Sequence, residues 1–546
     1  MVYSMQIRDL DAIENRTIGG VIRRQLGERP DQTAVMSRMG TLTYRELYEN
    51  GLSIGGGLQR MGVEQGTPVL LMLDNHLEYV TSWIGVGLIG AVEVPVNTAY
   101  RGTILAHVVN DSGARLVVVE KAFLDTLIAV REQLTHIDHV VVHGSTGALP
   151  TVDGWTVVAF EDLRDGAPAE PADLHAWDLM GIMYTSGTTG NSKGVLATHG
   201  LGYSYSSAHW IEPGEVIMCN LPLFHVGGQW AGVYAALIAG GTSAVVPRFS
   251  ASTFWDDVRY FGCTQTLLLG AMASFLSAQP ALDRDRDHPM RHINMVPLVP
   301  DYKEFSERFD TLLGAAYGLT EFSSPILVPY GLAEPGLTGW PREDYEVRLV
   351  DDNDMDVVPG ATGELVLRPK VPWAMMAGYH GLPDKTAEAW RNLWFHTGDA
   401  MSQDEQGRYH FVDRRNDALR VRGENVSSFE VENEVVTHPA VLSCAVVAVP
   451  SQHTEDEIKA VVVFKDGMSA APEELLKHLV PRLPYFMVPR YFEFLVEMPT
   501  TPTQKVKKAE LRQLGVTSAT WDREQAGYKL TKAGLQEPTP THASNS

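Results

Sequence analysis

Cysteine is scarce in this sequence. Cys219, Cys263 and Cys444 lie far apart and in no metal-binding spacing. This usage argues against a disulfide framework or a zinc site built from cysteines, and it favours a reducing compartment.

Long apolar runs are also missing. The most apolar stretch, residues 83–96, is interrupted by glycines, carries Glu93 and is too short to cross a bilayer. The first ten residues show no basic segment followed by an apolar core, so no signal peptide is expected. We therefore expect a cytoplasmic protein without a transmembrane segment.

Basic side chains are in deficit, because 44 lysines and arginines stand against 67 aspartates and glutamates, for a net charge of −23. A nucleic-acid surface needs clustered basic side chains to neutralise phosphates. The composition therefore predicts no nucleic-acid partner.

What is present is a chain of 546 residues, which is too long for one core and should hold at least two domains. Hydrophobic periodicity up to about residue 180 predicts helices over 44–58, 76–88, around 104–109 and over 124–134, with strands over 69–73, 92–96, 116–119 and 140–142. This alternation predicts a mostly parallel sheet covered on both faces. From about residue 344, short strands and tight turns indicate a β-rich subdomain, and a polar tail follows residue 517.

The stretch from Tyr184 to Gly194 is the strongest local signal. It follows an apolar run typical of a strand end, and its glycines allow the backbone to form an anion-binding nest while hydroxyls and a lysine add donors. It is not a Walker loop, because Lys193 is followed by Gly194. By itself it could be a flexible surface loop. As a phosphate cradle, its donors would be Thr185, Ser186, Gly187, Thr188, Thr189, Gly190 and Lys193.

Further motifs follow in chain order, at residues 221–225, 315–321, 378–388, 394–399, 411–417, 422–432, 484–491 and 501–512. Together with the loop they resemble the motifs of the adenylate-forming superfamily, the AMP-binding ligases that include the acyl-CoA synthetases. The resemblance spans residues from about 30 to about 515 and is nearest to acid–CoA ligases.

The resemblance implies an α/β fold with a large N-terminal domain of stacked, mostly parallel sheets with helices plus a small β-barrel-like subdomain. A smaller, mobile α/β C-terminal domain follows. The expected boundaries are 1–413 for the large domain, with its β-rich subdomain over about 335–413, then 414–417 for a hinge, 418–516 for the small domain and 517–546 for a flexible tail.

The nucleotide site is assigned by the same resemblance. Tyr317 and Gly318 would contact the adenine, with Tyr317 stacking on it, and Thr320 would offer a hydroxyl to the α-phosphate. Glu321 would be a hard oxygen ligand for Mg²⁺. Two further residues would complete the site: Asp399 would accept hydrogen bonds from both ribose hydroxyls, and Arg414 would contact the ribose or a phosphate.

The closing motifs supply the remaining roles. Lys505 corresponds to the catalytic lysine, preceded by Gln504 where glycine is commoner. Asn416 lies at the hinge position, where the family usually has Asp or Lys. Gly423 and Glu424 would lie beside coenzyme A.

The acyl pocket is implied less sharply. His225, Gln229 and Trp230 would lie near the carboxylate, although a lone histidine on an apolar stretch is more often a core residue. The bulky segment from Val296 to Pro300 replaces the small Gly/Ala-rich turn of the family, so the shape of the pocket stays open.

The implied reaction has two steps and uses ATP, Mg²⁺ and coenzyme A. A carboxylic acid first forms an acyl-adenylate with loss of pyrophosphate, and the thiol of coenzyme A then displaces AMP. Medium-chain, carnitine-like, aromatic and alicyclic acids all fit the pattern, and a homodimer is left open. Two alternatives stand beside this reading: a stand-alone adenylation enzyme that loads a carrier protein, and a non-catalytic nucleotide-binding protein with the same fold. The presence of Lys505, Glu321, Asp399 and Arg414 argues against the latter.

Overall fold

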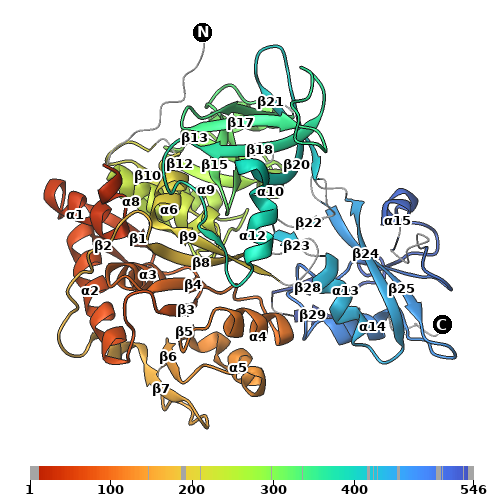
Figure 1. Cartoon of the computed structure of the whole chain (residues 1–546), viewed down its shortest axis with the longest axis horizontal. Helices are drawn as coiled ribbons and strands as arrows, with labels where there is room; N and C mark the ends of the chain where they lie inside the picture. The colour runs from red at the N-terminus through yellow and green to blue at the C-terminus, as the bar shows by residue number, and fades with distance from the viewer. Residues whose placement is uncertain are drawn as a thin grey trace. The chain divides into compact units, whose positions relative to one another are not determined.

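The computed structural model describes residues 12–145, 147–185, 192–208, 211–296, 298–299, 301–334, 336–414, 419–421, 424–426, 428–451, 456–499, 506, 508–532 and 534–538. The fold is mixed α/β, as predicted, with large sheets followed by a smaller C-terminal domain (Figure 1). The chain divides into two compact units: unit 1 holds Met1–Thr98, Val109–Thr185 and Lys193–Arg415, and unit 2 holds Ala99–Val108, Ser186–Ser192 and Asn416–Ser546. The predicted hinge at 414–417 spans the last division, and its motion stays a prediction.

One sheet of unit 1 has eight strands among the described residues, in the order β19-β9-β8-β4-β3-β5-β6-β7. All neighbours from β8 to β7 pair in parallel, whereas β9 and β19 run antiparallel. The consecutive residues Val69, Leu70 and Leu71 are all fully buried, which requires cover on both faces of the sheet. The strands are β3 (Pro68–Met72), β4 (Val92–Pro95), β5 (Leu116–Glu120), β6 (His139–His143), β7 (Thr156–Ala159), β8 (Leu179–Thr185), β9 (Lys193–Thr198) and β19 (Gly378–Tyr379).

A second sheet joins thirteen described strands in the order β17-β18-β20-β21-β16-β15-β14-β13-β12-β10-β11-β1-β2. The strands β10 to β14 pair in parallel. The pairs that link β14, β15, β16, β21, β20, β18 and β17 are antiparallel, and they begin at Ala315 and Val328, before the shift to short strands expected from about residue 344. The strands are β1 (Thr33–Ser37), β2 (Gly40–Thr43), β10 (Val216–Cys219), β11 (Thr242–Val245), β12 (Gln265–Leu269), β13 (His292–Val296), β14 (Leu312–Leu319), β15 (Ser323–Val328), β16 (Leu337–Pro341), β17 (Tyr345–Val350), β18 (Gly363–Pro369), β20 (Phe395–Gln403) and β21 (Tyr409–Arg414).

Helices join these strands, and the longest of them, α2, begins with a capping box between Thr43 and Glu46. The α-helices up to residue 389 are α1 (Ile18–Glu28), α2 (Tyr44–Arg60), α3 (Leu77–Leu88), α4 (Gly102–Asp111), α5 (Lys121–Ala129), α6 (His199–Ser206), α7 (Val226–Gly228), α8 (Ala235–Ala239), α9 (Phe254–Phe261), α10 (Gly270–Ser277), α11 (Tyr302–Phe309) and α12 (Pro383–Ala389). Short 3-10 turns are η1 (Ile13–Asn15), η2 (Arg131–Gln133), η3 (Phe160–Arg164) and η5 (Arg391–Leu393), and η4 (Gln229–Tyr234) is a π-helix. None of the described helices has the length and apolar character needed to cross a membrane.

Unit 2 is built on a four-stranded sheet in the order β24-β25-β26-β27, with two hairpins, β22-β23 and β28-β29, among its described residues. Its elements are β22 (Leu419–Val421), β23 (Glu424–Val426), α13 (Ser428–Val436), β24 (Val441–Pro450), β25 (Asp456–Phe464), α14 (Pro472–Leu479), β26 (Tyr491–Phe494), α15 (Lys508–Leu514), β27 (Trp521–Asp522), β28 (Lys529–Thr531) and β29 (Gly534–Gln536). The region expected to be a flexible tail from residue 517 therefore differs from expectation: β27 pairs with β26, because Trp521 and Asp522 register with Phe492 and Tyr491.

Candidate functional site

The glycine-rich loop connects β8 to β9. Thr185 ends β8 and Lys193 begins β9, and these two residues pair in the antiparallel register. The apolar run before the loop forms the buried strand that the sequence predicted. Ser186, Gly187, Thr188, Thr189 and Gly190 lie outside the described residues, so their role as a phosphate cradle stays a prediction.

Tyr379 links the two ends of the predicted phosphate and metal site. Its hydroxyl donates a hydrogen bond of 3.0 Å to Oε1 of Glu321, and its ring lies 4.3 Å from Nζ of Lys193. Strand β19 pairs with β9 at Val195, which places Tyr379 beside the base of the loop. A further bond of 2.9 Å, from the backbone N–H of Met376 to the carbonyl of Glu321, fixes the turn after β14.

Tyr379 was not singled out from the sequence. The signal was available, because the residue belongs to the motif at 378–388, but the motif alone does not indicate which side chain faces Glu321. The structure thus brings Lys193 and Glu321 to the same tyrosine. The ring of Tyr379 contacts the cation, and its hydroxyl contacts the carboxylate.

Tyr317 and Asp399, which the motifs assign to the nucleotide site, contact each other. The Tyr317 hydroxyl donates a hydrogen bond of 2.6 Å to Oδ2 of Asp399, which is 2 % exposed. They come from β14 and β20, and Asp399 registers with Arg414 of β21. Gly318 follows Tyr317, where a Cβ would lie 2.8 Å from Oγ of Ser324, so the position requires glycine. Thr320 and Glu321 complete the turn, both half-buried.

His225, Gln229 and Trp230 lie around the start of a helical segment. His225 is half-buried at the N-cap of α7, with its ring 4.9 Å from that of Phe224. Gln229 and Trp230 are fully buried in η4, where Trp230 packs edge-on against Tyr205 at 5.5 Å. These two side chains therefore shape the core behind the predicted acyl site.

A buried carboxyl group holds Gln229 in place. Glu93 accepts hydrogen bonds from Nε2 of Gln229 at 2.7 Å and from the hydroxyl of Tyr79 at 3.1 Å. Burial raises the pKa of Glu93 to about 8, an effect that these two donors only partly offset. Sequence reasoning treated Glu93 only as an interruption of an apolar run.

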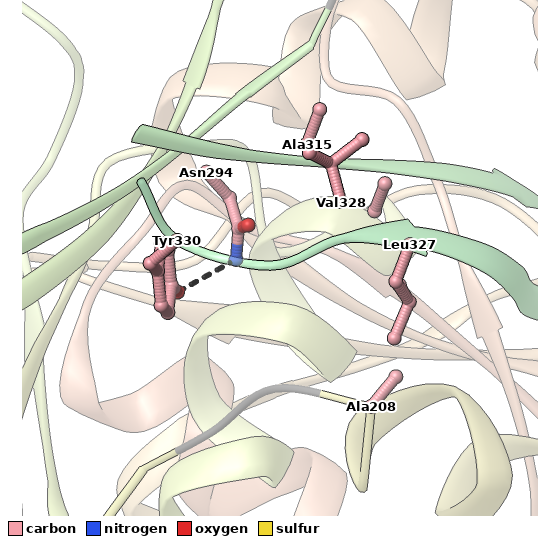
Figure 2. A pocket seen from close by; sticks show the side chains of 7 residues that line it. Ala208, Asn294, Ala315, Leu327, Val328 and Tyr330 are labelled. Atoms are coloured by element: carbon pink, nitrogen blue, oxygen red, sulfur yellow. Dashed lines mark hydrogen bonds between the residues drawn. The ribbon is translucent and has the colours of Figure 1, made fainter. Parts of the chain in front are cut away.

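A pocket that is partly open to solvent lies beside the strand that carries Tyr317 (Figure 2). Nδ2 of Asn294 donates a hydrogen bond of 3.0 Å to the hydroxyl of Tyr330 in its wall. Asn294 lies two residues before the Val296–Pro300 segment, in which the sequence departs from the family. The lining residues are Ala208, Asn294, Ala315, Ala316, Leu327, Val328 and Tyr330. Neither His225 nor the Gln229–Trp230 pair is among them.

The residues assigned to unit 2 are described only in part. Glu424 begins β23 and is half-buried. Asn416, Gly423 and Lys505 lie outside the described residues, as do positions 297 and 300 of the Val296–Pro300 segment in unit 1. Their roles stay predictions that rest on the motifs.

Comparisons with known proteins find similar sequences and structures. Residues 22–380 match the family model described as AMP-binding enzyme, and residues 430–505 match the AMP-binding enzyme C-terminal domain. A crotonobetaine/carnitine–CoA ligase from Salmonella typhi is 31% identical over 520 residues, which cover 91% of this chain and 99% of that protein.

Solved structures are similar over comparable lengths. An anthranilate CoA ligase in complex with anthranoyl-AMP has a TM-score of 0.69 at 26% identity, covering 92% of this chain and 98% of its own. An amide bond synthetase from Marinactinospora thermotolerans has a TM-score of 0.79 at 25% identity, covering 90% and 99%. The o-succinylbenzoate CoA synthetase of Bacillus subtilis, with a TM-score of 0.78 at 23% identity and coverage of 90% and 97%, shares the fold.

Proposed function

We propose, from the premise that this chain belongs to the AMP-binding enzyme family, that it is an ATP-dependent, AMP-forming acid–CoA ligase. The observation that carries the proposal is the convergence in unit 1 of residues that the motifs assign to one nucleotide. Tyr317 contacts Asp399, and Tyr379 joins Glu321 to Lys193. Four separate motifs thereby supply aromatic, carboxylate and cationic groups suited to adenine, ribose and phosphates.

In the first step, the substrate carboxylate attacks the α-phosphorus of ATP, and pyrophosphate leaves as the P–O bond to it breaks. The protein contributes positioning and charge neutralisation. Lys193 and the loop before it would hold the outer phosphates, Thr320 would donate to the α-phosphate, and Lys505 would bridge the carboxylate and the α-phosphate.

Mg²⁺ suits the Glu321 carboxylate, a hard oxygen donor whose orientation is set by Tyr379. A cation bound there would neutralise charge on the phosphates. In the second step, the thiolate of coenzyme A attacks the adenylate carbonyl and AMP leaves. Gly423 and Glu424 would border the pantetheine arm of coenzyme A. Between the two steps, rotation of the small domain about Asn416 would withdraw Lys505 from the site and bring Gly423 and Glu424 to it.

The acid is proposed to be small, because similar proteins are named as ligases of crotonobetaine or carnitine and of anthranilate. The pocket beside the strand of Tyr317 is lined by alanine and aliphatic side chains, and its Asn294–Tyr330 pair offers polar contacts. Carnitine-like and single-ring acids are therefore the first candidates, and His225, Gln229 and Trp230 are proposed to lie near the carboxylate.

Two assays test the reaction. Acid-dependent exchange of labelled pyrophosphate into ATP reports adenylation, and thioester formation with coenzyme A reports the second step. A panel of acids that includes carnitine, crotonobetaine and anthranilate identifies the substrate. Exchange without a thioester would favour the carrier-protein or amide-forming alternatives, and no exchange with any acid would favour a nucleotide-binding protein without catalysis.

Lys505→Ala separates the steps. We expect this variant to lose pyrophosphate exchange yet to form thioester from supplied acyl-adenylate, because only adenylation needs the ammonium group near the α-phosphate. Lys507→Ala is the matched control, since the sequence places this lysine in a run of charged side chains, which is normally a solvated face. Normal exchange in the Lys505 variant would reject its assignment.

We also propose a cytoplasmic location, supported by the low cysteine content, and a homodimer remains a proposal. Cell fractionation tests the first, and light scattering of the purified chain tests the second.

A further inference from the structure

The carboxyl ends of β3, β5 and β6 bring together four side chains that the proposed reaction does not use. Glu120 is the last residue of β5 and His143 the last of β6, and the two are partners in the parallel register. His76 caps the N-terminus of α3, which follows β3, and Glu78 lies in the first turn of that helix. The sheet topology thus gathers two imidazoles and two carboxylates at one edge.

The distances within this cluster, His76, Glu78, Glu120 and His143, are short. Nδ1 of His76 lies 3.2 Å from Oε2 of Glu78, and Nε2 of His76 lies 3.5 Å from Oε2 of Glu120. The imidazoles of His76 and His143 stack at 4.6 Å. One potential ligand atom from each of His76, Glu78 and His143 falls within 4.8 Å of the others. Ligand atoms about a tetrahedral zinc ion lie roughly 3.4 Å apart, so rotation of these side chains toward one another would let one ion reach all three.

The hydrogen bonding of the two histidines is incomplete. Nε2 of His76 and Nδ1 of His143 are buried atoms with no hydrogen-bond partner. Nδ1 of His76 lies 3.2 Å from both the backbone N–H of Tyr79 and Oε2 of Glu78. In the tautomer that carries its proton on Nδ1 and donates it to Glu78, Nε2 is the unprotonated nitrogen that can bind a metal. Buried polar atoms normally have partners, and a cation would be one for Nε2 of His76 and Nδ1 of His143.

The charges gathered at the cluster favour a cation. The Glu120 carboxylate lies 3.5 Å from Nε2 of His76, and Glu78 brings a second carboxylate to the other nitrogen of the ring. Two glutamates and two neutral imidazoles would carry a negative charge that a divalent ion balances.

We propose that His76, Glu78 and His143, with Glu120 adjoining them, form a binding site for a zinc-type divalent cation. Imidazole and carboxylate donors together suit Zn²⁺, Co²⁺ or Ni²⁺, whereas Mg²⁺ prefers oxygen ligands and water. The bound ion ties the start of α3 to the ends of β5 and β6. Its role is structural, and it is separate from the magnesium proposed at Glu321.

The test uses the full chain, freed of metal by a chelator and kept without ATP. Titration with Co²⁺ followed by visible absorbance, and with Zn²⁺ by calorimetry, should show a site that saturates near one equivalent. Zn²⁺ should also raise the melting temperature, since a ligand of the folded state stabilises it. His76→Gln/His143→Gln should lose the site, and Glu78→Gln should weaken it by at least about tenfold, the range seen when even an outer-shell partner is lost.

Two controls define the site. His139 lies on β6, the strand that ends at His143, and its Nδ1 is 2.6 Å from Oδ1 of Asp138. The variant His139→Gln should therefore bind Zn²⁺ and Co²⁺ as well as the wild type. Glu321→Gln should also keep it, which separates this site from the ATP-dependent reaction. The proposal is overturned if the wild type binds no more Co²⁺ than the double variant, or if His139→Gln loses as much. Should the double variant fail to fold, unchanged Zn²⁺ affinity in Glu78→Gln also overturns it.

Discussion

Glu93 is the residue whose ionisation is coupled most clearly to folding. It is 1 % exposed, and burial raises its pKa to about 8 from an ordinary value of 4.5. Between these two values the folded chain holds a proton that the unfolded chain has released. The free energy of unfolding therefore falls as pH rises from 4.5 to 8. Glu93 contributes at most ~1.4 kcal/mol per pH unit to this fall.

Glu93→Gln should remove that dependence. The amide is neutral at every pH, and its oxygen can still accept from Gln229 and Tyr79. We expect the variant to match the wild type near pH 5 and to exceed it at pH 8 by on the order of 3 kcal/mol in the free energy of unfolding. Urea unfolding at both pH values measures this, and parallel pH profiles for the two proteins would contradict it.

Tyr379 is the second residue with a separable role. Tyr379→Phe removes the hydrogen bond to Glu321 and keeps the ring beside Lys193, whereas Tyr379→Leu removes both. A hydrogen bond to a charged group contributes roughly 1.5–3 kcal/mol, so the phenylalanine variant should need at least about tenfold more Mg²⁺ for half-maximal pyrophosphate exchange. The leucine variant should additionally raise the KM for ATP. Identical magnesium titrations for wild type and Tyr379→Phe would show that the bond does not orient the carboxylate.

At the scale of elements, periodicity identified β3, α3, β4 and β5 because each is long enough to show its own apolar pattern. Contacts between distant elements were not predictable in this way. Tyr317 and Asp399 are 82 residues apart and meet only because β14 and β20 lie in one sheet. The motifs identified these two residues through resemblance, but neither the role of Tyr379 nor that of Glu93 followed from local sequence. The short strand β27 was missed because two residues carry no period.

The segment at residues 221–225, which leads into α7, is positioned by a residue from another element. Asn75, 7 % exposed, donates to the carbonyls of Leu221 at 2.8 Å and Val246 at 3.2 Å, and accepts from the N–H of Leu223 at 2.8 Å. Asn75→Ala would leave these backbone groups unpaired. The segment that ends at His225 should then loosen.

We expect Asn75→Ala to lower the free energy of unfolding by roughly 2–4 kcal/mol, from buried groups left without partners. Because His225 is proposed to lie near the carboxylate, the KM for the acid should rise more than the KM for ATP. Asn110→Ala, at a half-buried asparagine that also bonds backbone groups, is the control. Equal changes in both KM values would indicate general destabilisation instead of a positioning role.

The whole molecule consists of two units, and the C-terminal residues belong to the fold of the second. Glu493 accepts hydrogen bonds from Thr517 at 3.2 Å and from Thr520 at 2.8 Å, and it also pairs with the buried Lys459. Arg490 contacts Asp522 through two nitrogens at 3.0 and 3.1 Å. Deletion of residues 517–546 would remove β27 and expose the edge of β26.

This truncation should destabilise unit 2 by roughly 3 kcal/mol or more, because removing one member of a buried charged pair is costly by itself. In differential scanning calorimetry, we expect the melting temperature of unit 2 to fall by roughly 10 °C. The melting temperature of unit 1 should stay unchanged. Deletion of residues 539–546 alone removes none of these contacts and should leave both transitions unchanged. If the longer deletion also leaves both unchanged, the pairing of β27 with β26 contributes nothing to the stability of the second unit.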